Sequence, residues 1–332
     1  MSVALAPSTS SFDKLRRCPE SIEGTASGHR CAQHIPVLLR EAVEALALRT
    51  GGRYVDATLG GGAHAEAILR ESEEWLLGID ADPEALRIAT ERLEPYRPRL
   101  TTVNDNFRNL EEVCRQHDFL PVQGILFDLG LSSYQLEDPY RGFSFQLDAP
   151  LDMRYSPSQP VTAADLVNNL SEARLACLIH HFGEERHSRL IARRIVENRP
   201  LRSSLELARV VERAVGRRGR LHPATKTFLA LRIAVNQELE SLELALKQAV
   251  NLLDQGGRLV VISFQSLEDR LVKEFLRRES QGCICPPAMP VCTCGHVPTL
   301  KLVSRKAVLP SPAELRANPR SRSAKMRVAE KL

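Results

Sequence analysis

Four short apolar runs in the first half of the chain alternate with segments of helical periodicity. Three of these runs lead into an aspartate. Runs of this kind are typical of strands buried on both faces of a parallel sheet. Because successive strand–helix units form a parallel sheet with right-handed crossovers, we expect the three aspartates to meet at its carboxyl edge. The expected strands are 54–57, 75–80, 100–103 and 124–128, and the aspartates are Asp56, Asp80 and Asp128.

Two of the helical segments carry start signals. Pro36 lies in the expected first turn of the first helix, and Asp82 precedes Pro83 at the start of the third. Aspartate accepts hydrogen bonds from first-turn amides, and proline fits the first helical position. The sequence therefore predicts helices over 34–48, 63–70, 83–93 and 109–117.

The alternation breaks after Asp128. A long polar loop comes first, and residues 161–218 then show helical periodicity only, which predicts an inserted helical subdomain. A single amphipathic helix is predicted over 224–253, ended by the pair Gly256-Gly257. The remaining expected elements are a strand over 258–264, a helix over 267–278 and a last strand over 325–329.

The chain of 332 residues carries a formal charge of +4 and has no apolar run long enough to span a membrane. Residues 1–28 lack the apolar segment of a secretion signal, so we expect a disordered extension there. Scattered cysteines fit a reducing, cytoplasmic setting. We expect the rest of the chain to comprise a first part of the sheet domain (29–140), a loop and helical insert that binds substrate (141–222), and a second part of the sheet domain (223–332).

A glycine-rich segment after the first expected strand indicates a nucleotide cofactor. Gly60-x-Gly62-x-x-Ala65 formally fits the dinucleotide pattern, in which glycine lets the backbone approach the ligand. Asp80, at the end of the next strand, suits the two hydroxyl groups of a ribose. NAD and S-adenosylmethionine (SAM) both satisfy this pattern, so an NAD-dependent oxidoreductase and a SAM-dependent enzyme stay open at this point.

Further motifs point to one family. They are HIPVLL (34–39), YVDATLGGGAH (54–64), GIDADPEA (78–85), ILFDLGLSS (125–133), RGFSFQLDAPLDMR (141–154), GEER (183–186), HPATKTFLALRIAVNQEL (222–239), GGRLVVISFQSLEDRLVK (256–273) and NPRSRSAKMRVAEK (318–331). With these motifs in this order, the chain resembles the MraW/RsmH family, bacterial methyltransferases that modify the exocyclic N4 of a cytosine in 16S ribosomal RNA. The resemblance implies an α/β fold, namely a Rossmann-like class I SAM-dependent methyltransferase sheet with an inserted all-helical subdomain. It also implies SAM as cofactor and the decoding region of the small ribosomal subunit as substrate, and homodimer formation stays open.

The resemblance also implies which residues form the cofactor site. Asp80 would bind the ribose, and Phe107 would lie beside the adenine, although a core phenylalanine at a helix start explains Phe107 equally well. Asp128 is in addition the candidate catalytic residue, because its carboxylate could accept a hydrogen bond from the cytosine amine. Two alternatives stay open: carbonyls and hydroxyls of residues 130–133 accept that bond instead, or Asp128 only holds the methionine end of SAM. The implied SAM-binding residues are Gly62, Ala63, His64, Asp80, Phe107, Asp128 and Gln135.

Four positions depart from the family pattern. The family more often has a large residue where this chain has Gly61, and glycine where it has Ala63. Tyr134 stands where proline is usual, and Gln265 where histidine is usual. Glutamine forms hydrogen bonds but cannot shuttle a proton. These departures keep a non-catalytic RNA-binding scaffold open as a third interpretation.

Basic residues crowd the expected helical insert and the tail. Clustered arginines suit contacts with phosphates, and such contacts would offset the free-energy cost of flipping the target base out of its stack. Arg141 and Arg154 flank the loop after Asp128 and would either contact RNA or hold the loop. The other candidates are Arg186, Arg189, Arg193, Arg194, Arg217, Arg218 and Arg220 in the insert, and Arg316, Arg320, Arg322, Lys325 and Arg327 in the tail.

A compact group of four cysteines lies near the end of the chain: Cys283, Cys285, Cys292 and Cys294. Two interpretations stay open, a structural zinc site and a reduced loop without metal. Zinc sites usually show C-x2-C, and the C-x-C spacing found here is a poorer match. The spacing alone favours the metal-free loop.

Overall fold

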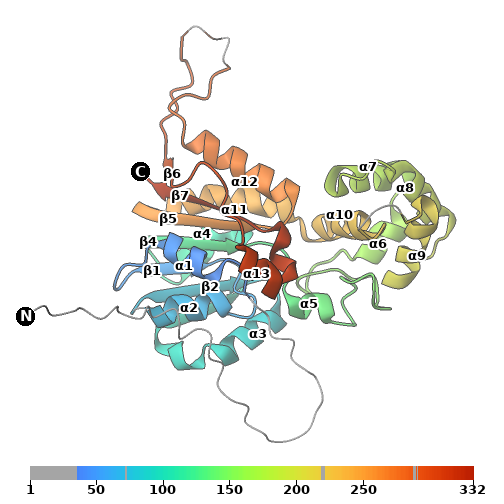
Figure 1. The fold of residues 1–332 in the computed structure, drawn as a ribbon, viewed down its shortest axis with the longest axis horizontal. Coiled ribbons are helices and arrows are strands. Elements are labelled where there is room, and N and C mark those ends of the chain that lie inside the picture. The colour runs from blue at the N-terminus through green and yellow to red at the C-terminus, as the bar shows by residue number, and fades with distance from the viewer. Residues whose placement is uncertain (1–35, 72, 218–220, 287–288, 290) are drawn as a thin grey trace, which may run out of the picture. The chain divides into compact units, whose positions relative to one another are not determined.

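A seven-stranded sheet with the order β3-β2-β1-β4-β5-β7-β6 forms the centre of the computed structural model (Figure 1). The structure describes residues 36–332 except 72, 218–220, 287–288 and 290, so the extension expected at 1–28 lies outside the described residues. The strands are β1 Arg53–Asp56, β2 Trp75–Asp80, β3 Leu100–Asn104, β4 Val122–Asp128, β5 Leu253–Ser263, β6 Leu300–Leu302 and β7 Lys325–Lys331. The first five pair in parallel, and β7 runs antiparallel to both β5 and β6. The expected α/β class with a Rossmann-like sheet is confirmed.

The apolar runs of the sequence become strands because both faces of the sheet are covered. In β4, Ile125 and Phe127 belong to one buried cluster, while Leu126, which points the other way, belongs to a second cluster. The first face is covered by α4 Leu110–Gln116, α11 Glu238–Leu252 and α12 Ser266–Glu279. The second is covered by α1 Leu39–Leu46, α2 Ala63–Glu71 and α3 Pro83–Arg92. In α3, the Asp82 side chain accepts a hydrogen bond from the Glu84 amide, as predicted for an N-cap.

A separate group of helices forms a third buried cluster, drawn beside the sheet in Figure 1. The elements here are α5 Ser133–Glu137, α6 Ala163–Asn169, α7 Glu172–Gly183, α8 Ser188–Glu197, α9 Ser204–Val215 and α10 Thr225–Asn236. Hydroxyl caps begin α6, α7 and α9: Thr162, Ser171 and Ser203 each accept a hydrogen bond from a first-turn amide.

The single helix predicted over 224–253 is wrong, because two helices occupy this range. The chain turns at Gln237, whose φ of 50° lies in the left-handed region, and α10 ends there while α11 begins. Around a continuous helix, positions 232 and 238 would lie about 120° apart. The turn instead lets Arg232 bind Glu238 through two hydrogen bonds of 2.7 and 2.8 Å. As a result α10 joins the helical cluster, which therefore extends to Asn236, beyond the expected limit at 222.

Other element ends also differ from expectation. The pair Gly256-Gly257 does not end a helix, because α11 stops at Leu252 and Leu253 already has extended backbone at the start of β5. The first helix begins at Leu39, three residues after Pro36. β6 and a short helix, α13 Pro312–Ala317, were not predicted, because three strand residues and six helix residues are too few to show a periodic pattern.

Candidate active site

Four acidic side chains follow one another along the carboxyl edge of the sheet. Asp80, Asp56 and Asp128 end the neighbouring strands β2, β1 and β4, and Glu268 lies in the first turn of α12, directly after β5. We call these four residues the acid row. Asp56 and Glu268 are 1% and 3% exposed, and the other two are partly buried. The parallel register of the strands thus brings the three predicted aspartates to one edge, as expected.

Burial raises the pKa of every member of the acid row. It raises the pKa of Asp56 to about 7 and that of Asp80 to about 6, with Asp80 adding to the shift of Asp56. The pKa of Glu268 rises to about 7, from burial and then from nearby Glu238. That of Asp128 is raised well above its ordinary value by burial and by Asp56 and Glu268. A bound cation would relieve this mutual repulsion.

Asp128 has one carboxylate oxygen without a partner. Its Oδ2 lies 3.6 Å from Nδ1 of His64, and the other ring nitrogen of His64 lies 3.2 Å from the Val37 carbonyl oxygen. Its Oδ1 is buried and has no hydrogen-bond partner among the described residues. An unsatisfied buried acceptor costs about 1–3 kcal/mol. The carboxylate is therefore able to take a donor or a cation from a ligand.

The glycine loop is held against Asp80. The Gly60 amide donates to Asp80 Oδ2 at 2.7 Å, and the Asp82 amide donates to Asp80 Oδ1 at 2.8 Å. Gly62 has a φ of +76°, and a Cβ there would lie 3.1 Å from Leu93. Glycine at 62 is thus needed for the left-handed backbone and for packing on α3. The structure places Ala63 at the first position of α2, next to His64.

Gln135 fastens the loop after β4 to the loop after β2. Its Nε2 donates to Asp82 Oδ2 at 2.8 Å, and its Oε1 accepts from the Ser132 amide at 3.0 Å. Arg141 donates to the same Asp82 oxygen and to the Tyr155 carbonyl. The structure thus brings Gln135 close to the end of β2, where its amide is engaged by the protein itself.

Phe107 lies just beyond β3, at the start of the short 3-10 helix Phe107–Asn109. Its ring is partly buried and meets Phe127 edge to face, with ring centroids 5.8 Å apart. The neighbouring backbone is tied to the site, because the Asp105 amide donates to the Asp80 carbonyl at 3.1 Å. The core contact of Phe107 is therefore present, and its contact with adenine stays a prediction.

A second polar network, which the sequence did not predict, adjoins the acid row. Glu238 binds Arg232 and accepts a hydrogen bond from the Tyr155 hydroxyl at 3.1 Å. Gln265 Nε2 donates to Glu268 Oε1 at 2.7 Å and lies 3.4 Å from Glu238 Oε2. Gln265 Oε1 is buried and has no partner among the described residues, like Asp128 Oδ1. The sequence carries no signal for this network, because charged residues such as Arg232 and Glu238 are expected on the polar face of the amphipathic helix that was predicted over 224–253.

Two departures from the family pattern meet in space. A Cβ built on Gly61 would lie 3.0 Å from Cε2 of the Tyr134 ring. Tyr134 thus occupies the room that a larger residue at 61 would need, and the Arg92 guanidinium donates to the Gly61 carbonyl at 2.9 Å.

Arg141 and Arg154 both hold the loop. Arg154 binds Asp152 through Nε and Nη2 at 2.8 Å and donates to the Pro157 and Gln159 carbonyls. In the tail, Lys325 and Arg327 pair with Asp269, and Arg320 with Glu137. These basic side chains are engaged in contacts within the protein.

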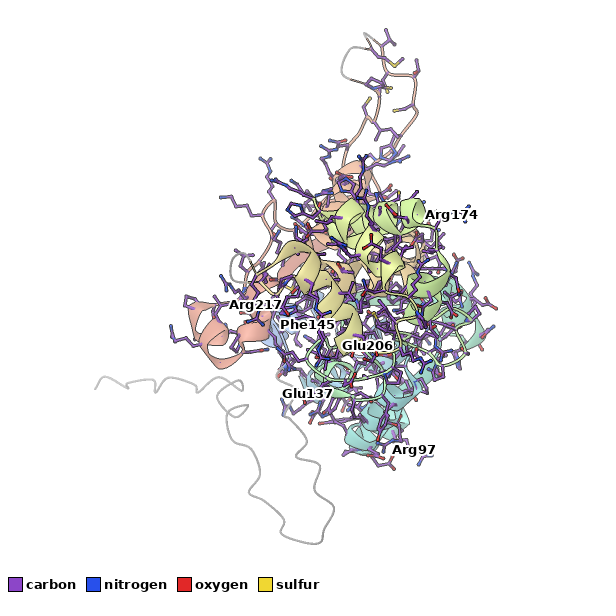
Figure 2. The ribbon with its side chains drawn as sticks, turned by 90° about the vertical axis from the view of Figure 1, so that its right-hand side faces the viewer. Arg97, Glu137, Phe145, Arg174, Glu206 and Arg217 are labelled. Atoms are coloured by element: carbon purple, nitrogen blue, oxygen red, sulfur yellow. The ribbon has the colours of Figure 1, made fainter. Side chains whose placement is uncertain are left out.

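The helical cluster carries exposed arginines on its outer surface. Figure 2 views this end of the molecule, with Arg174 and Arg217 on opposite sides and Phe145 and Glu206 between them. Arg186 and Arg189 are exposed and have no ion pair among the described residues, whereas Arg193, Arg194 and Arg217 each pair with a glutamate. Arg218 and Arg220 lie outside the described residues.

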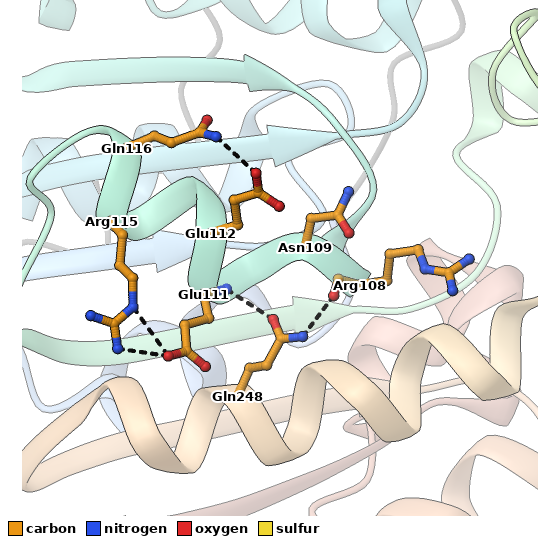
Figure 3. A pocket seen from close by; sticks show the side chains of 7 residues that line it. All are labelled: Arg108, Asn109, Glu111, Glu112, Arg115, Gln116 and Gln248. Carbon is orange, nitrogen blue, oxygen red and sulfur yellow. Dashed lines mark hydrogen bonds and ion pairs between the residues drawn. The ribbon is translucent and has the colours of Figure 1, made fainter.

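A pocket on α4 and α11 is a weaker candidate for a ligand-binding site than the acid row. In Figure 3, Gln248 reaches across it, accepting from the Glu111 amide and donating to the Arg108 carbonyl, both at 2.8 Å. Arg115 and Gln116 pair with glutamates on their own helix. The lining residues are Arg108, Asn109, Glu111, Glu112, Arg115, Gln116 and Gln248. Their polar groups are thus largely satisfied.

No helix of the described part is both long and apolar enough to cross a membrane.

Comparison with known proteins gives a consistent result. The MraW methylase family matches residues 31–332. "Ribosomal RNA small subunit methyltransferase H" of Dehalococcoides mccartyi is 57% identical over 302 residues, covering 90% of this chain and 86% of that protein. Proteins of the same name from Thermomicrobium roseum and Carboxydothermus hydrogenoformans are 54% and 51% identical, covering 90% of this chain and 94% and 98% of theirs.

Proposed function

This chain belongs to the MraW methylase family, and we propose that it methylates the exocyclic N4 of a cytosine in the 16S RNA of the small ribosomal subunit, with SAM as methyl donor. The printed names of its relatives support ribosomal RNA as the substrate. Such a reaction places the enzyme in the cytoplasm, where ribosomes are assembled. Assembled subunits as substrate and homodimer formation remain predictions.

The observation that carries the proposal is the acid row with its unpartnered oxygen. SAM bears a sulfonium and an ammonium group, and both would be stabilised beside Asp56 and Asp128, which have no lysine or arginine ion pair among the described residues. The diphosphate of NAD is anionic and would meet the same acids with repulsion. The Gly60 amide, which a phosphate would need, already donates to Asp80. The site therefore favours SAM over NAD.

Asp80, Asp128 and the glycine loop would hold the cofactor. When bound, SAM supplies an activated methyl group on a sulfonium. The chain's own task is to orient the cytosine amine, whose lone pair is delocalised into the ring and is a weak nucleophile. Asp128 Oδ1, in the acid row, and Gln265 Oε1, beside it, are acceptors with no partner in the described part of the chain, and the amine carries two N–H donors. Hydrogen bonds to them would hold the amine in line and stabilise the positive charge that develops on N4.

The proton balance is simple. A bond forms between N4 and the methyl carbon, the carbon–sulfur bond breaks, and N4 then carries a positive charge and releases one proton. A carboxylate with a raised pKa, such as Asp128, is a suitable acceptor. A strong base is not required beforehand, because the nitrogen becomes acidic only once it is methylated. This also explains how a chain with Gln265 in place of histidine can still be active.

The helical cluster is the proposed substrate-binding part. Arg186 and Arg189 are exposed there and form no ion pair with any residue that the structure describes, so they are available to phosphates. Extrusion of the target base costs a few kcal/mol, and charge-assisted phosphate contacts would offset that cost.

The test uses small ribosomal subunits from a strain that lacks the enzyme. We expect purified protein and SAM to produce N4-methylated cytosine, identified by nucleoside mass spectrometry, and no product without SAM. Calorimetry with SAM separates the alternatives: binding without turnover would favour the RNA-binding scaffold, and no binding to folded protein would overturn the proposal.

A further inference from the structure

The four cysteines of the loop between α12 and β6 come together around one point. The Sγ atoms of Cys283, Cys285, Cys292 and Cys294 all lie within 4.8 Å of one another. We propose that these four side chains bind one zinc ion as thiolates. The site lies outside the proposed methyl-transfer machinery and does not depend on it.

The sulfur positions match a tetrahedral zinc site. With a Zn–S distance of about 2.3 Å, the sulfurs of a regular tetrahedron are about 3.8 Å apart. The structure has 3.6 Å between the Sγ atoms of Cys292 and Cys294, and 3.8 Å between those of Cys294 and Cys283. All four cysteines are free thiols. The sulfurs are thus placed to share a central ion.

The C-x-C spacing is compatible with this geometry. Side chains two residues apart in an extended segment point to the same side of the backbone. Each arm of the loop therefore offers two sulfurs on one side, and the two arms face each other. The structure thus favours the zinc site, whereas the spacing alone favoured the metal-free loop.

Backbone amides point at the sulfurs from both arms of the loop. The Ile284 amide lies 3.5 Å from Cys294 Sγ, and the Thr293 amide lies 3.4 Å from Cys285 Sγ, each across the loop. Within one arm, the Cys285 amide lies 3.4 Å from Cys283 Sγ. Such N–H donors stabilise thiolates and orient metal ligands. A reduced loop with neutral thiols has no need for this arrangement.

Among the described residues of the loop, the larger apolar side chains are mostly exposed and do not form a core. Met289, Val291 and Val297 are 44%, 69% and 71% exposed. At the base of the loop, the Thr299 amide donates to the Glu279 carbonyl, and His296 Nε2 lies 2.9 Å from the Arg278 carbonyl oxygen. His296 is thus engaged outside the cluster. A small segment without a core usually requires a cross-link, and four thiolates select zinc over magnesium or calcium.

Metal analysis of the full chain tests this site. Tag-free protein is purified under reducing conditions without chelators, and zinc and iron are measured by mass spectrometry. We expect about one zinc per chain, and none in the variant Cys292→Ser/Cys294→Ser. The matched control is Cys177→Ser, an exposed cysteine on α7 that should leave the zinc content unchanged. Metal-free protein with four titratable thiols, disulfides within the cluster, or iron in place of zinc would each overturn the proposal.

Two further measurements keep this test separate from the proposed function. The double variant should bind SAM as the parent does, because the loop lies outside all three core clusters, and this also shows that the variant is folded. Hydrogen exchange of peptides covering 282–299 should become faster in the double variant and after chelation, but not in the control. Unchanged exchange in a variant that no longer holds zinc would contradict a structural role for the ion.

Discussion

The Tyr134 ring fills the space next to Gly61, with its Cε2 3.0 Å from the position of a Cβ at residue 61. Both residues depart from the family pattern described for the sequence, and the contact places them against each other. A large residue at 61 and a tyrosine at 134 would overlap. Glycine at 61 therefore leaves the room that the Tyr134 ring occupies.

The variant Gly61→Leu should lower the free energy of unfolding by about 1–3 kcal/mol, because it overpacks a filled space. The added change Tyr134→Pro should recover much of this loss. Proline is tolerated there because Tyr134 lies in the first turn of α5. Tyr134→Phe is the matched control and should give no recovery, since it retains the ring. Chemical denaturation of the parent, Gly61→Leu, Tyr134→Pro and the double variant measures the coupling, and additive effects would show that the two positions are independent.

Asp128→Asn tests the role of the carboxylate whose Oδ1 has no partner among the described residues. We expect kcat to fall by about 10²–10³-fold, because the variant keeps an acceptor oxygen but loses the negative charge that would stabilise the positive charge developing on N4. SAM affinity, measured by calorimetry, separates catalysis from cofactor binding. The control Asp254→Asn alters an exposed aspartate near the start of β5 and should change neither quantity. Near-normal turnover by Asp128→Asn would exclude a catalytic role.

The acid row should make the ligand-free protein less stable as pH rises. Asp56 has a pKa near 7 in the folded state, above its ordinary value of 3.8, so the folded state binds more protons between about pH 4 and 7. Its contribution to stability therefore falls through this window, at up to about 1.4 kcal/mol per pH unit. Other carboxylates with lowered pKa values, such as Asp269, act in the opposite direction below pH 4.

Asp56→Asn isolates this effect, because it removes the charge and keeps the acceptor for the Thr58 amide. We expect the variant to gain stability relative to the parent as pH rises from 5 to 8, in urea denaturation without SAM. A constant difference across this range would contradict the raised pKa of Asp56. SAM should reduce the difference, because a bound cation stabilises the ionised carboxylate.

Much of the fold followed from local patterns. The bounds of β2 at Trp75–Asp80 and the cap at Asp82 agree with prediction, because short apolar runs and an Asp-Pro start are local signals. The turn at Gln237 was missed, since the apolar periodicity continues through it. The pairing of Arg232 with Glu238 spans the turn and stabilises it, and a pattern of apolar residues gives no sign of a contact between two charged side chains.

The candidate active site was also predicted only in part. Parallel register is enough to bring Asp56, Asp80 and Asp128 to one edge, so the core of the site was foreseen. Glu268 was not, because a charged residue in the first turn of an amphipathic helix normally faces solvent. Only the packing of α12 against the sheet and of Gln265 against Glu268 reveals that this carboxylate is buried.

Arg186 and Arg189 are expected to contribute to the affinity for RNA by neutralising phosphates. The variant Arg186→Gln/Arg189→Gln should bind ribosomal RNA more weakly, and the slope of log affinity against log salt should become less steep by about 0.7 for each phosphate that is no longer neutralised. The control is Arg97→Gln, an exposed arginine drawn well away from the helical cluster in Figure 2, which should leave the slope unchanged. Methyl transfer should show a higher KM with little change in kcat, because both side chains are exposed on the helical cluster and the acid row is left intact. An unchanged slope in the double variant would show that the RNA follows another face of the protein.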